Sequence, residues 1–490
     1  MESNNESLYQ LIQRSLTPEG TLPNDFSLPK TDGEKIHFAD GAMDGISVFH
    51  TALRPEAAPL LEEAVTAASA GDTERARSLV DSFCEGGRML AAIDKIQEFI
   101  IDRRDQLNAP ALYRFGLQLA QTGPQREEVK FGLSLLELFQ TGSNENVRNM
   151  VRDLACSDEF TLFCLFVMGT WDNANDEIFS AAKNTRGWGR IHAVERLEPE
   201  TEEIETWLAE HGWDNDVLPS YSALECAQKT RYLERLRGEM SPDQYRAAAG
   251  LMAGLLDEGP TAGISACEEP GAVLTAFLGQ SSRLPLAADD YPVIAEIRDY
   301  AESHDLEEPK RAADALLGSP ACREALTRDM AQGNNLRLAK RLGLDYVPWA
   351  VKAMENDFAK NFSLVDLLMP DGLLVDQMIA LFEERLPLDA LSTGSADEMG
   401  LGEAFRDHRA LSYIVQHLRP YPGKGITLLR AALNSPVVSN RNMALSALEE
   451  WVKKENRPLD DLYPELHAYL RELLDREVRE DVRGRMELLL

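Results

Sequence analysis

The sequence predicts an all-α protein, an α-solenoid of stacked helical hairpins with a small mixed cap at its N-terminus. Three observations predict this fold. Apolar residues recur with helical spacing through most of the chain, and a phrase led by arginine returns in the frame Arg-x-x-Ala-x-x-x-Leu. Short clusters of glycine, asparagine, serine and proline separate helical segments of about 10–16 residues, which is typical of helices stacked as hairpins.

The composition fits this class. The chain has 490 residues, of which 44% are hydrophobic but only 7% aromatic. Its core must therefore be built mainly from leucine, alanine, valine and isoleucine, a mixture that suits close-packed helices better than β-sandwiches. The length allows two to four ordinary domains or one extended repeat array.

The first 55 residues differ from the rest because Asp-Gly dipeptides follow several prolines there. Ile36 and Phe38 alternate with polar residues before the Asp-Gly turns, and Ile46 and Val48 alternate after them. This pattern predicts a small mixed cap over residues 1–55, with a possible β-hairpin around the Asp-Gly turns.

A possible metal site in this cap rests on the turn that contains Asp40 and Asp44, which His37 and His50 flank. A metal would need a third or fourth convergent ligand that the sequence does not place. Asp-Gly pairs usually mark tight turns, so we interpret the two aspartates as turn residues.

Helical periodicity begins after the cap. Val129, Leu133 and Leu136, for example, stand at positions i, i+4 and i+7 and would form one apolar stripe. The segment 391–402, rich in glycine, serine and aspartate, is the best candidate for a linker or mobile loop. We therefore expect helical repeats over residues 56–390 and a continuation of the array over residues 403–490.

The arginine phrase occurs in full as Arg190-x-x-Ala193-x-x-x-Leu197, and the same frame begins again at Arg441. A looser copy begins at Arg148, 42 residues before Arg190. In a stacked helical hairpin, the alanine allows a close helix–helix contact, and the leucine four residues later places a larger side chain on the same face.

These residues resemble the second helix of HEAT repeats, which opens on a turn followed by a Val-Arg-x-x-Ala-x-x-x-Leu phrase. The spacing of 42 residues lies inside the HEAT and armadillo period of roughly 40–47 residues. The chain also resembles uncharacterised bacterial solenoid proteins. The resemblance implies that the arginines make contacts between repeats. Only the copy with Val147 keeps an apolar residue before the arginine, and a compact helical protein without true repeats is the alternative.

The helix around residue 190 carries the most unusual set of polar side chains. Arg190, His192 and Glu195 combine a fixed positive charge, a titratable imidazole and a carboxylate within about two helical turns. His192 and Glu195 stand three residues apart and share a face. They could contact a ligand or peptide on the inner surface of the solenoid. Alternatively, Trp188 packs in the core and the charges pair locally.

A second candidate contact lies near the C-terminus, where Arg441 and Asn442 could meet a partner or cap the helix that starts there. Oxygen-rich turns at residues 172–176 and 213–216 lack the spacing of a calcium loop, and helix capping explains them. We therefore expect no metal site, no cofactor and no identified catalytic residue. The predicted binding residues are Trp188, Arg190, His192, Glu195, Arg441 and Asn442.

The charge of the chain restricts its partners. With 82 acidic and 50 basic residues, the net charge is −32. Such a surface repels phosphate backbones and anionic lipids, so we expect neither nucleic-acid nor membrane binding, and HEAT-fold recognition of DNA lesions is disfavoured. We expect a protein or peptide as the partner, and a basic segment on it would be the complementary match. The six cysteines are scattered and no secretory signal is visible, which favours a cytoplasmic location.

The sequence therefore predicts a non-enzymatic scaffold that binds a protein or peptide along the concave face of an acidic solenoid. The alternative is an enzyme with its active site in the groove, where Arg190 would clamp an anion and His192 and Glu195 would act as general acid and base. No phosphate-binding glycine loop, zinc-protease motif or nucleophile elbow occurs, so the familiar routes to catalysis are missing.

Overall fold

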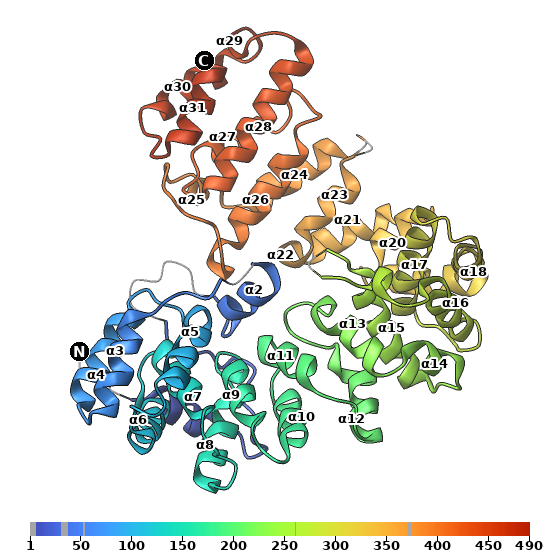
Figure 1. The fold of residues 1–490 in the computed structure, drawn as a ribbon. Coiled ribbons are helices and arrows are strands. Elements are labelled where there is room, and N and C mark those ends of the chain that lie inside the picture. Colours follow the sequence, from blue (N-terminus) through green and yellow to red (C-terminus); the bar gives the residue numbers. More distant parts are fainter. Residues whose placement is uncertain (1–5, 31–37, 52–53, 260, 371, 373) are drawn as a thin grey trace. The chain divides into compact units, whose positions relative to one another are not determined.

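The computed structural model describes residues 6–30, 38–51, 54–259, 261–370, 372 and 374–490. In these residues the regular structure is helical, with no β-strand and one isolated parallel bridge between Glu398 and Val437. The all-α prediction is confirmed. No helix in the described residues is long and apolar enough to cross a membrane. The chain divides into two compact units (Figure 1). The first unit consists of the residues up to Leu286 together with Val293–Leu316. The second unit consists of Ala287–Pro292 together with Leu317–Leu490.

In the first unit, helices that are close in sequence pack in pairs, among them α3 with α4, α6 with α7, α8 with α9 and α10 with α11. The helices of this unit are α1 (Leu8–Ser15), α2 (Ala42–His50), α3 (Pro59–Ser69), α4 (Thr73–Cys84), α5 (Met89–Asp102), α6 (Ala109–Thr122), α7 (Arg126–Leu136), α8 (Glu145–Ala155), α9 (Thr161–Met168), α10 (Ala174–Asn184), α11 (Trp188–Arg196), α12 (Glu202–Trp207), α13 (Ser220–Lys229), α14 (Tyr232–Arg237), α15 (Pro242–Leu256), α16 (Pro270–Ser281), α17 (Tyr291–Ser303) and α18 (Glu307–Leu317).

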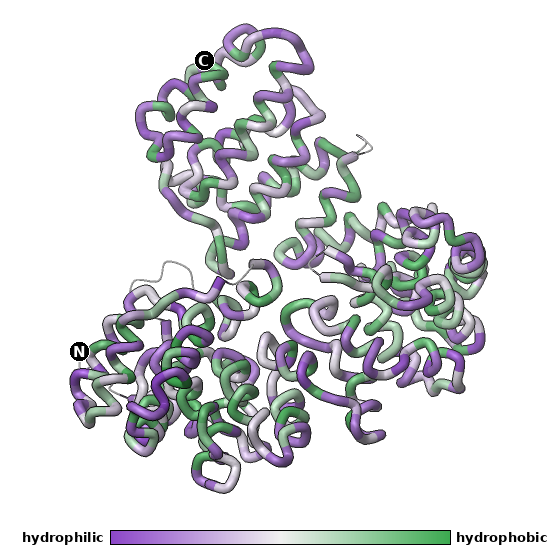
Figure 2. The backbone as a smooth tube through the Cα atoms, in the orientation of Figure 1, coloured by the Kyte–Doolittle hydropathy of each residue, from purple (hydrophilic) through white to green (hydrophobic). Residues whose placement is uncertain are grey.

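Helix α8 shows why these segments are helical. The Asn144 side chain accepts the N–H groups of Asn146 and Val147, which would otherwise lack an acceptor in the first turn. Val147, Val151 and Leu154 form an apolar stripe that is buried against the neighbouring helices. Hydrophobic and hydrophilic residues likewise follow one another along other helices of the described chain (Figure 2).

The arginines of the recurring phrase join successive helical segments in this unit. The Arg148 guanidinium lies 2.5 Å from Oε1 of Glu177 on α10. Together with Arg152, it holds the pKa of Glu177 down to about 2, chiefly through hydrogen bonds. The Arg190 guanidinium donates to the carbonyl oxygen of Asp214 at 2.6 Å. Arg148 therefore joins α8 to α10, and Arg190 joins α11 to the loop that contains Asp214.

The β-hairpin expected in the N-terminal cap is wrong in its second half, because Ile46 and Val48 lie within helix α2. Ile36, in the expected first strand, lies outside the described residues. An alternation over three residues is too short to distinguish a strand from one turn of helix. The deciding feature is tertiary: Ala42 of α2 packs against Trp188 and Ile191 of α11.

The second unit has a single apolar core that runs from Met330 to Met486. The segment 391–402, expected to break the array, lies inside this unit. Its Gly394 N–H donates to the carbonyl of Asn434 at 2.9 Å, which holds it against the following helices. The helices are α19 (Pro320–Met330), α20 (Leu336–Arg341), α21 (Val347–Asn356), α22 (Phe358–Asn361), α23 (Val365–Leu368), α24 (Val375–Arg385), α25 (Leu388–Leu391), α26 (Arg406–His417), α27 (Ile426–Leu433), α28 (Val438–Glu455), α29 (Leu459–Leu462), α30 (Pro464–Leu474) and α31 (Glu480–Leu489).

Candidate ligand pocket above a buried ion cluster

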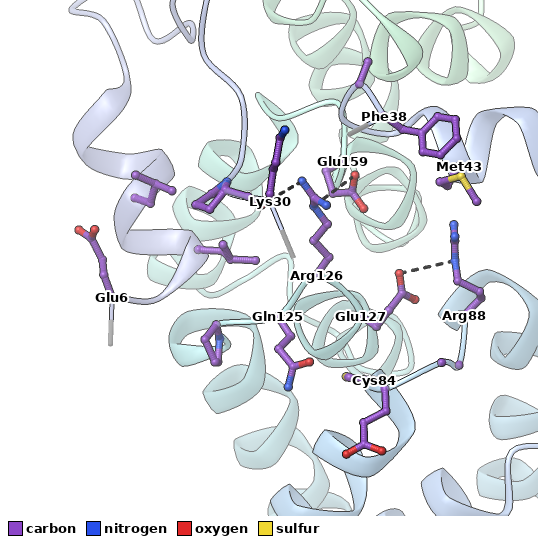
Figure 3. A pocket seen from close by; sticks show the side chains of 18 of the residues that line it. Glu6, Lys30, Phe38, Met43, Cys84, Arg88, Gln125, Arg126, Glu127 and Glu159 are labelled. Atoms are coloured by element: carbon purple, nitrogen blue, oxygen red, sulfur yellow. Dashed lines mark hydrogen bonds and ion pairs between the residues drawn. The ribbon is translucent and has the colours of Figure 1, made fainter. Parts of the chain in front are cut away.

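The first unit contains a pocket of about 950 Å³. Its walls come from α1, the segments around residues 29–30 and 38–39, the end of α4 with the loop that follows, and the start of α7 (Figure 3). Four basic side chains and four acidic side chains line it. In a chain with a large acidic excess, a lining with equal numbers of basic and acidic side chains is locally less acidic than the average. The charged lining residues are Arg14, Lys30, Arg88, Arg126, Glu6, Glu85, Glu127 and Glu159.

The two Asp-Gly dipeptides of the cap bring α2 to this pocket. Gly41 has a φ of 75°, in the left-handed region that favours glycine, and it precedes the first turn of α2. A Cβ at Gly41 would overlap the carbonyl oxygen of Asp158, and a Cβ at Gly45 would overlap the ring of Trp188. The glycines therefore allow the backbone of α2 to lie directly against the helix that carries Trp188.

Beneath the pocket, the Lys130 side chain is buried, with 1% of its surface exposed. Its Nζ lies 2.6 Å from Oδ2 of Asp44, 2.6 Å from Oε1 of Glu159 and 3.1 Å from Oε1 of Glu127. Burial favours the neutral amine, but the three carboxylates outweigh it and hold the pKa of Lys130 above its usual value. The ammonium is therefore charged at neutral pH.

The same carboxylates also accept backbone N–H groups. Oε2 of Glu159 accepts from Gly41 at 2.9 Å, and Oε2 of Glu127 accepts from Met89 at 2.5 Å. Asp44 keeps its pKa below the usual value: burial alone would raise it, but Lys130 and Arg88 have the larger effect. We call Asp44, Glu127, Lys130 and Glu159 the Lys130 cluster. It fastens α2 to the starts of α5 and α7 and to the segment before α9.

One side of the pocket combines a guanidinium with exposed apolar side chains. Phe38 and Met43 are large and apolar, yet 46% and 41% of their surfaces are exposed. Arg88 stands beside Met43 on the same side, whereas Lys30 lies across the pocket (Figure 3). Exposed apolar residues that border a pocket are typical of binding sites.

Several titratable side chains of the pocket are shielded or already engaged within the protein. Within the described residues, no group of three or more histidine, cysteine, aspartate or glutamate side chains is arranged to hold a metal ion. Burial, together with nearby acidic groups, raises the pKa of the Cys84 thiol to about 12, so this lining residue is not a thiolate at neutral pH. Glu127 and Glu159 are occupied by the lysine and by backbone donors.

Of the residues predicted to bind, four lie on α11 but do not share one surface. Trp188 and His192 are buried beside Phe49 of α2, and neither ring nitrogen of His192 has a hydrogen-bond partner within the described residues. Arg190 donates to backbone carbonyl oxygens. Glu195 is exposed and pairs with the neighbouring Arg196 at 3.0 Å. Binding through this set stays a prediction.

The other two predicted residues belong to α28, in the second unit. Arg441 is buried, lies 2.9 Å from Oε2 of the equally buried Glu477, and donates to the carbonyl oxygen of Ser435 at 2.7 Å. Asn442 accepts a hydrogen bond from Arg485 at 2.7 Å. These contacts are internal to the second unit. The prediction that Arg441 and Asn442 meet a partner is not tested by them.

Sequence reasoning missed the Lys130 cluster. Asp40 and Asp44 were interpreted as turn residues, yet Asp44 contacts Lys130 and Asp40 lies 3.2 Å from Arg126. Of the two histidines considered beside them, His37 lies outside the described residues, and Nε2 of His50 is 2.5 Å from the Tyr221 hydroxyl. The available signal was a lysine among apolar residues in the phrase Val-Lys-Phe-Gly-Leu.

Comparisons with known proteins give no further lead. No protein-family model matches the chain, and neither the curated proteins nor the solved structures show a significant similarity to it. The function has to be inferred from the geometry.

Proposed function

We propose that this chain is a non-enzymatic scaffold, built as an α-solenoid related to HEAT and armadillo repeats, which holds a peptide segment of a partner protein. The pairwise packing of successive helices supports the solenoid, as do the contact of Arg148 with α10 and that of Arg190 with the loop at Asp214. The acidic surface, with a net charge of −32, would attract a partner that carries a basic segment.

The observation that carries the proposal is the pocket of the first unit. Phe38 and Met43 offer exposed apolar surface, and full burial of such a side chain contributes roughly 1.5–3 kcal/mol. The Lys130 cluster fixes Asp44, one residue from Met43, so this part of the rim is held before a ligand arrives. A preformed site loses less conformational entropy on binding. Both features favour an apolar side chain of a peptide as the occupant.

The alternative, an enzyme centred on Arg190, His192 and Glu195, has less support. His192 is buried with 1% of its surface exposed, and the Arg190 guanidinium donates to two backbone carbonyl groups. A general base must reach the proton that it removes, and an enclosed imidazole cannot do so. We therefore propose peptide binding alone.

Peptide display on the immobilised full-length chain tests this proposal. Random dodecapeptides are selected on the wild-type protein, and the affinities of the enriched peptides are then measured by fluorescence polarisation. The test variant is Phe38→Ser/Met43→Ser. The control is Ile101→Ser on α5, because Ile101 is also a large exposed apolar residue, with 53% of its surface exposed, but does not line the pocket.

We expect the enriched peptides to bind the double variant at least tenfold more weakly and the control variant with unchanged affinity. All three substituted positions are exposed, so circular dichroism should show the same melting curve for every variant. Failure to enrich any peptide would overturn the proposal. Equal affinity for the wild-type protein and the double variant would show that the binding site lies elsewhere.

A further inference from the structure

Resting on the proposed peptide binding, we infer that the pocket recognises a carboxylate of the peptide through Arg88, next to an apolar side chain that packs on Phe38 and Met43. The ligand is thus a peptide segment in which an acidic group adjoins a large apolar residue. This goes beyond peptide binding because it names the chemistry that the pocket selects.

The two glutamates of the pocket floor, Glu127 and Glu159, already have partners inside the protein. Lys130 contacts Glu127 and Glu159 and is enclosed, so it cannot itself reach a ligand. Backbone N–H groups occupy the second oxygen of each glutamate. These two side chains therefore have little capacity left to bind a cationic group of a ligand.

Arg88, in contrast, has hydrogen-bond donors left without an acceptor in the described part of the chain. A guanidinium carries five N–H donors. Within the described residues only one of them forms a hydrogen bond, from Nη2 to Oδ1 of Asp44 at 2.9 Å. The Nε atom is buried and 3.9 Å from Glu127, so the donors that a ligand could reach are the remaining Nη hydrogens. With 36% of its side chain exposed at the pocket, Arg88 offers unused donors in the planar geometry that binds a carboxylate.

The position of Arg88 implies that the peptide also carries an apolar side chain next to its carboxylate. Figure 3 shows Arg88, Met43 and Phe38 on one side of the pocket. A carboxylate held by the guanidinium would place the neighbouring side chain of the peptide against the exposed apolar pair. The acidity of the whole chain does not oppose this at physiological salt, because charges farther away than about 8 Å are largely screened.

The test uses capped fluorescent hexapeptide pools with randomised outer positions and a fixed central pair, either Phe-Asp, Phe-Asn or Phe-Lys. Their binding to the full-length chain is measured by fluorescence polarisation at 150 mM salt. A fourth pool ends in phenylalanine with a free α-carboxylate. The variants are Arg88→Met, Arg88→Lys and the matched control Lys30→Met, which removes one positive charge from the opposite side of the same pocket.

We expect the wild-type protein to bind the Phe-Asp pool about tenfold more tightly than the Phe-Asn pool, and Phe-Lys no better than Phe-Asn. Arg88→Met should abolish the preference while leaving the affinity for Phe-Asn within about twofold, and Arg88→Lys should retain part of it. Lys30→Met should keep the preference intact. Tight binding of the fourth pool would also support the inference, with a chain terminus as the source of the carboxylate.

Three outcomes would overturn the inference. In the first, Phe-Asn binds as tightly as Phe-Asp while binding still depends on Phe38 and Met43, so that peptide binding stands without carboxylate recognition. In the second, Arg88→Met weakens the binding of all pools equally, which assigns Arg88 a purely structural role. In the third, no pool binds to any form of the protein, and the proposed function fails as well.

Discussion

Replacing Lys130 with methionine should destabilise the first unit more than any surface substitution. The methionine fills a similar volume but leaves three buried carboxylates without their ammonium, and breaking a buried ion pair typically costs about 3–5 kcal/mol. Arg88 still pairs with Asp44, and backbone N–H groups still reach Glu127 and Glu159. We therefore expect the lower end of that range, about 3 kcal/mol.

The assay is urea unfolding of the full-length chain followed by circular dichroism, with hydrogen exchange to locate the effect in α2 and α7. The control is Lys95→Met, which removes an exposed lysine from a surface pair with Glu98 and should produce no measurable change. A double-mutant cycle with Asp44→Asn should give a coupling energy of at least about 1 kcal/mol, because the two groups are in direct contact.

The stability loss caused by Lys130→Met should also depend on pH in a definite direction. In the wild-type protein the pKa of Asp44 is lowered, so its contribution to stability is present above its unfolded pKa of about 3.9 and is lost as the pH falls through the folded pKa. In Lys130→Met the buried carboxylates resist ionisation, so the deficit should be largest near pH 7 and shrink below about pH 5. A deficit at pH 7 no larger than that of Lys95→Met would refute the reasoning.

Three further predictions concern packing and buried charge. Gly45→Ala should cost about 1–2 kcal/mol in urea unfolding, since its Cβ would overlap Trp188. Arg441→Met should cost about 3–5 kcal/mol, because Glu477 would stay buried without a cation; thermal melting of the full chain measures this. Burial raises the pKa of Glu128 to about 7, above its unfolded value of about 4.3, so its contribution favours the folded state at low pH and is lost as the pH rises through 7. Glu128→Gln should therefore lose less stability than the wild type between pH 5 and pH 8 in urea unfolding.

The helices were predictable because their signals are local. The stripe of Val129, Leu133 and Leu136 is buried. The Asn144 side chain caps the N-terminus of α8, as expected of an asparagine in a turn before a helix. Arg148 of the arginine phrase does pair with Glu177 on α10, whereas the repeat relationship that the phrase predicts stays a prediction. Such features depend on neighbours within a few residues, or on a spacing that recurs along the chain.

The pocket was not predictable for the opposite reason. Asp44 meets Lys130 across 86 positions of sequence, and Gly41 meets Glu159 across 118. A lysine in an apolar helix face can extend to the surface along its methylene chain, so its sequence context does not reveal that it will be enclosed. The helical state of residues 46–48 was missed for a related reason, because it depends on the contact of α2 with Trp188.

The two Asp-Gly dipeptides that seat α2 also set the order in which the chain can fold. Gly45 meets Trp188, and Gly41 meets Asp158 and Glu159, so α2 cannot dock until the residues up to about 190 have been synthesised. At roughly 5–20 residues per second, the ribosome needs on the order of 10 s to make that intervening stretch. During this interval Phe38 and Met43 lack the pocket around them. Helix α2 therefore docks only after the helices between it and α11 have been made, and until then its apolar side chains are open to chaperones.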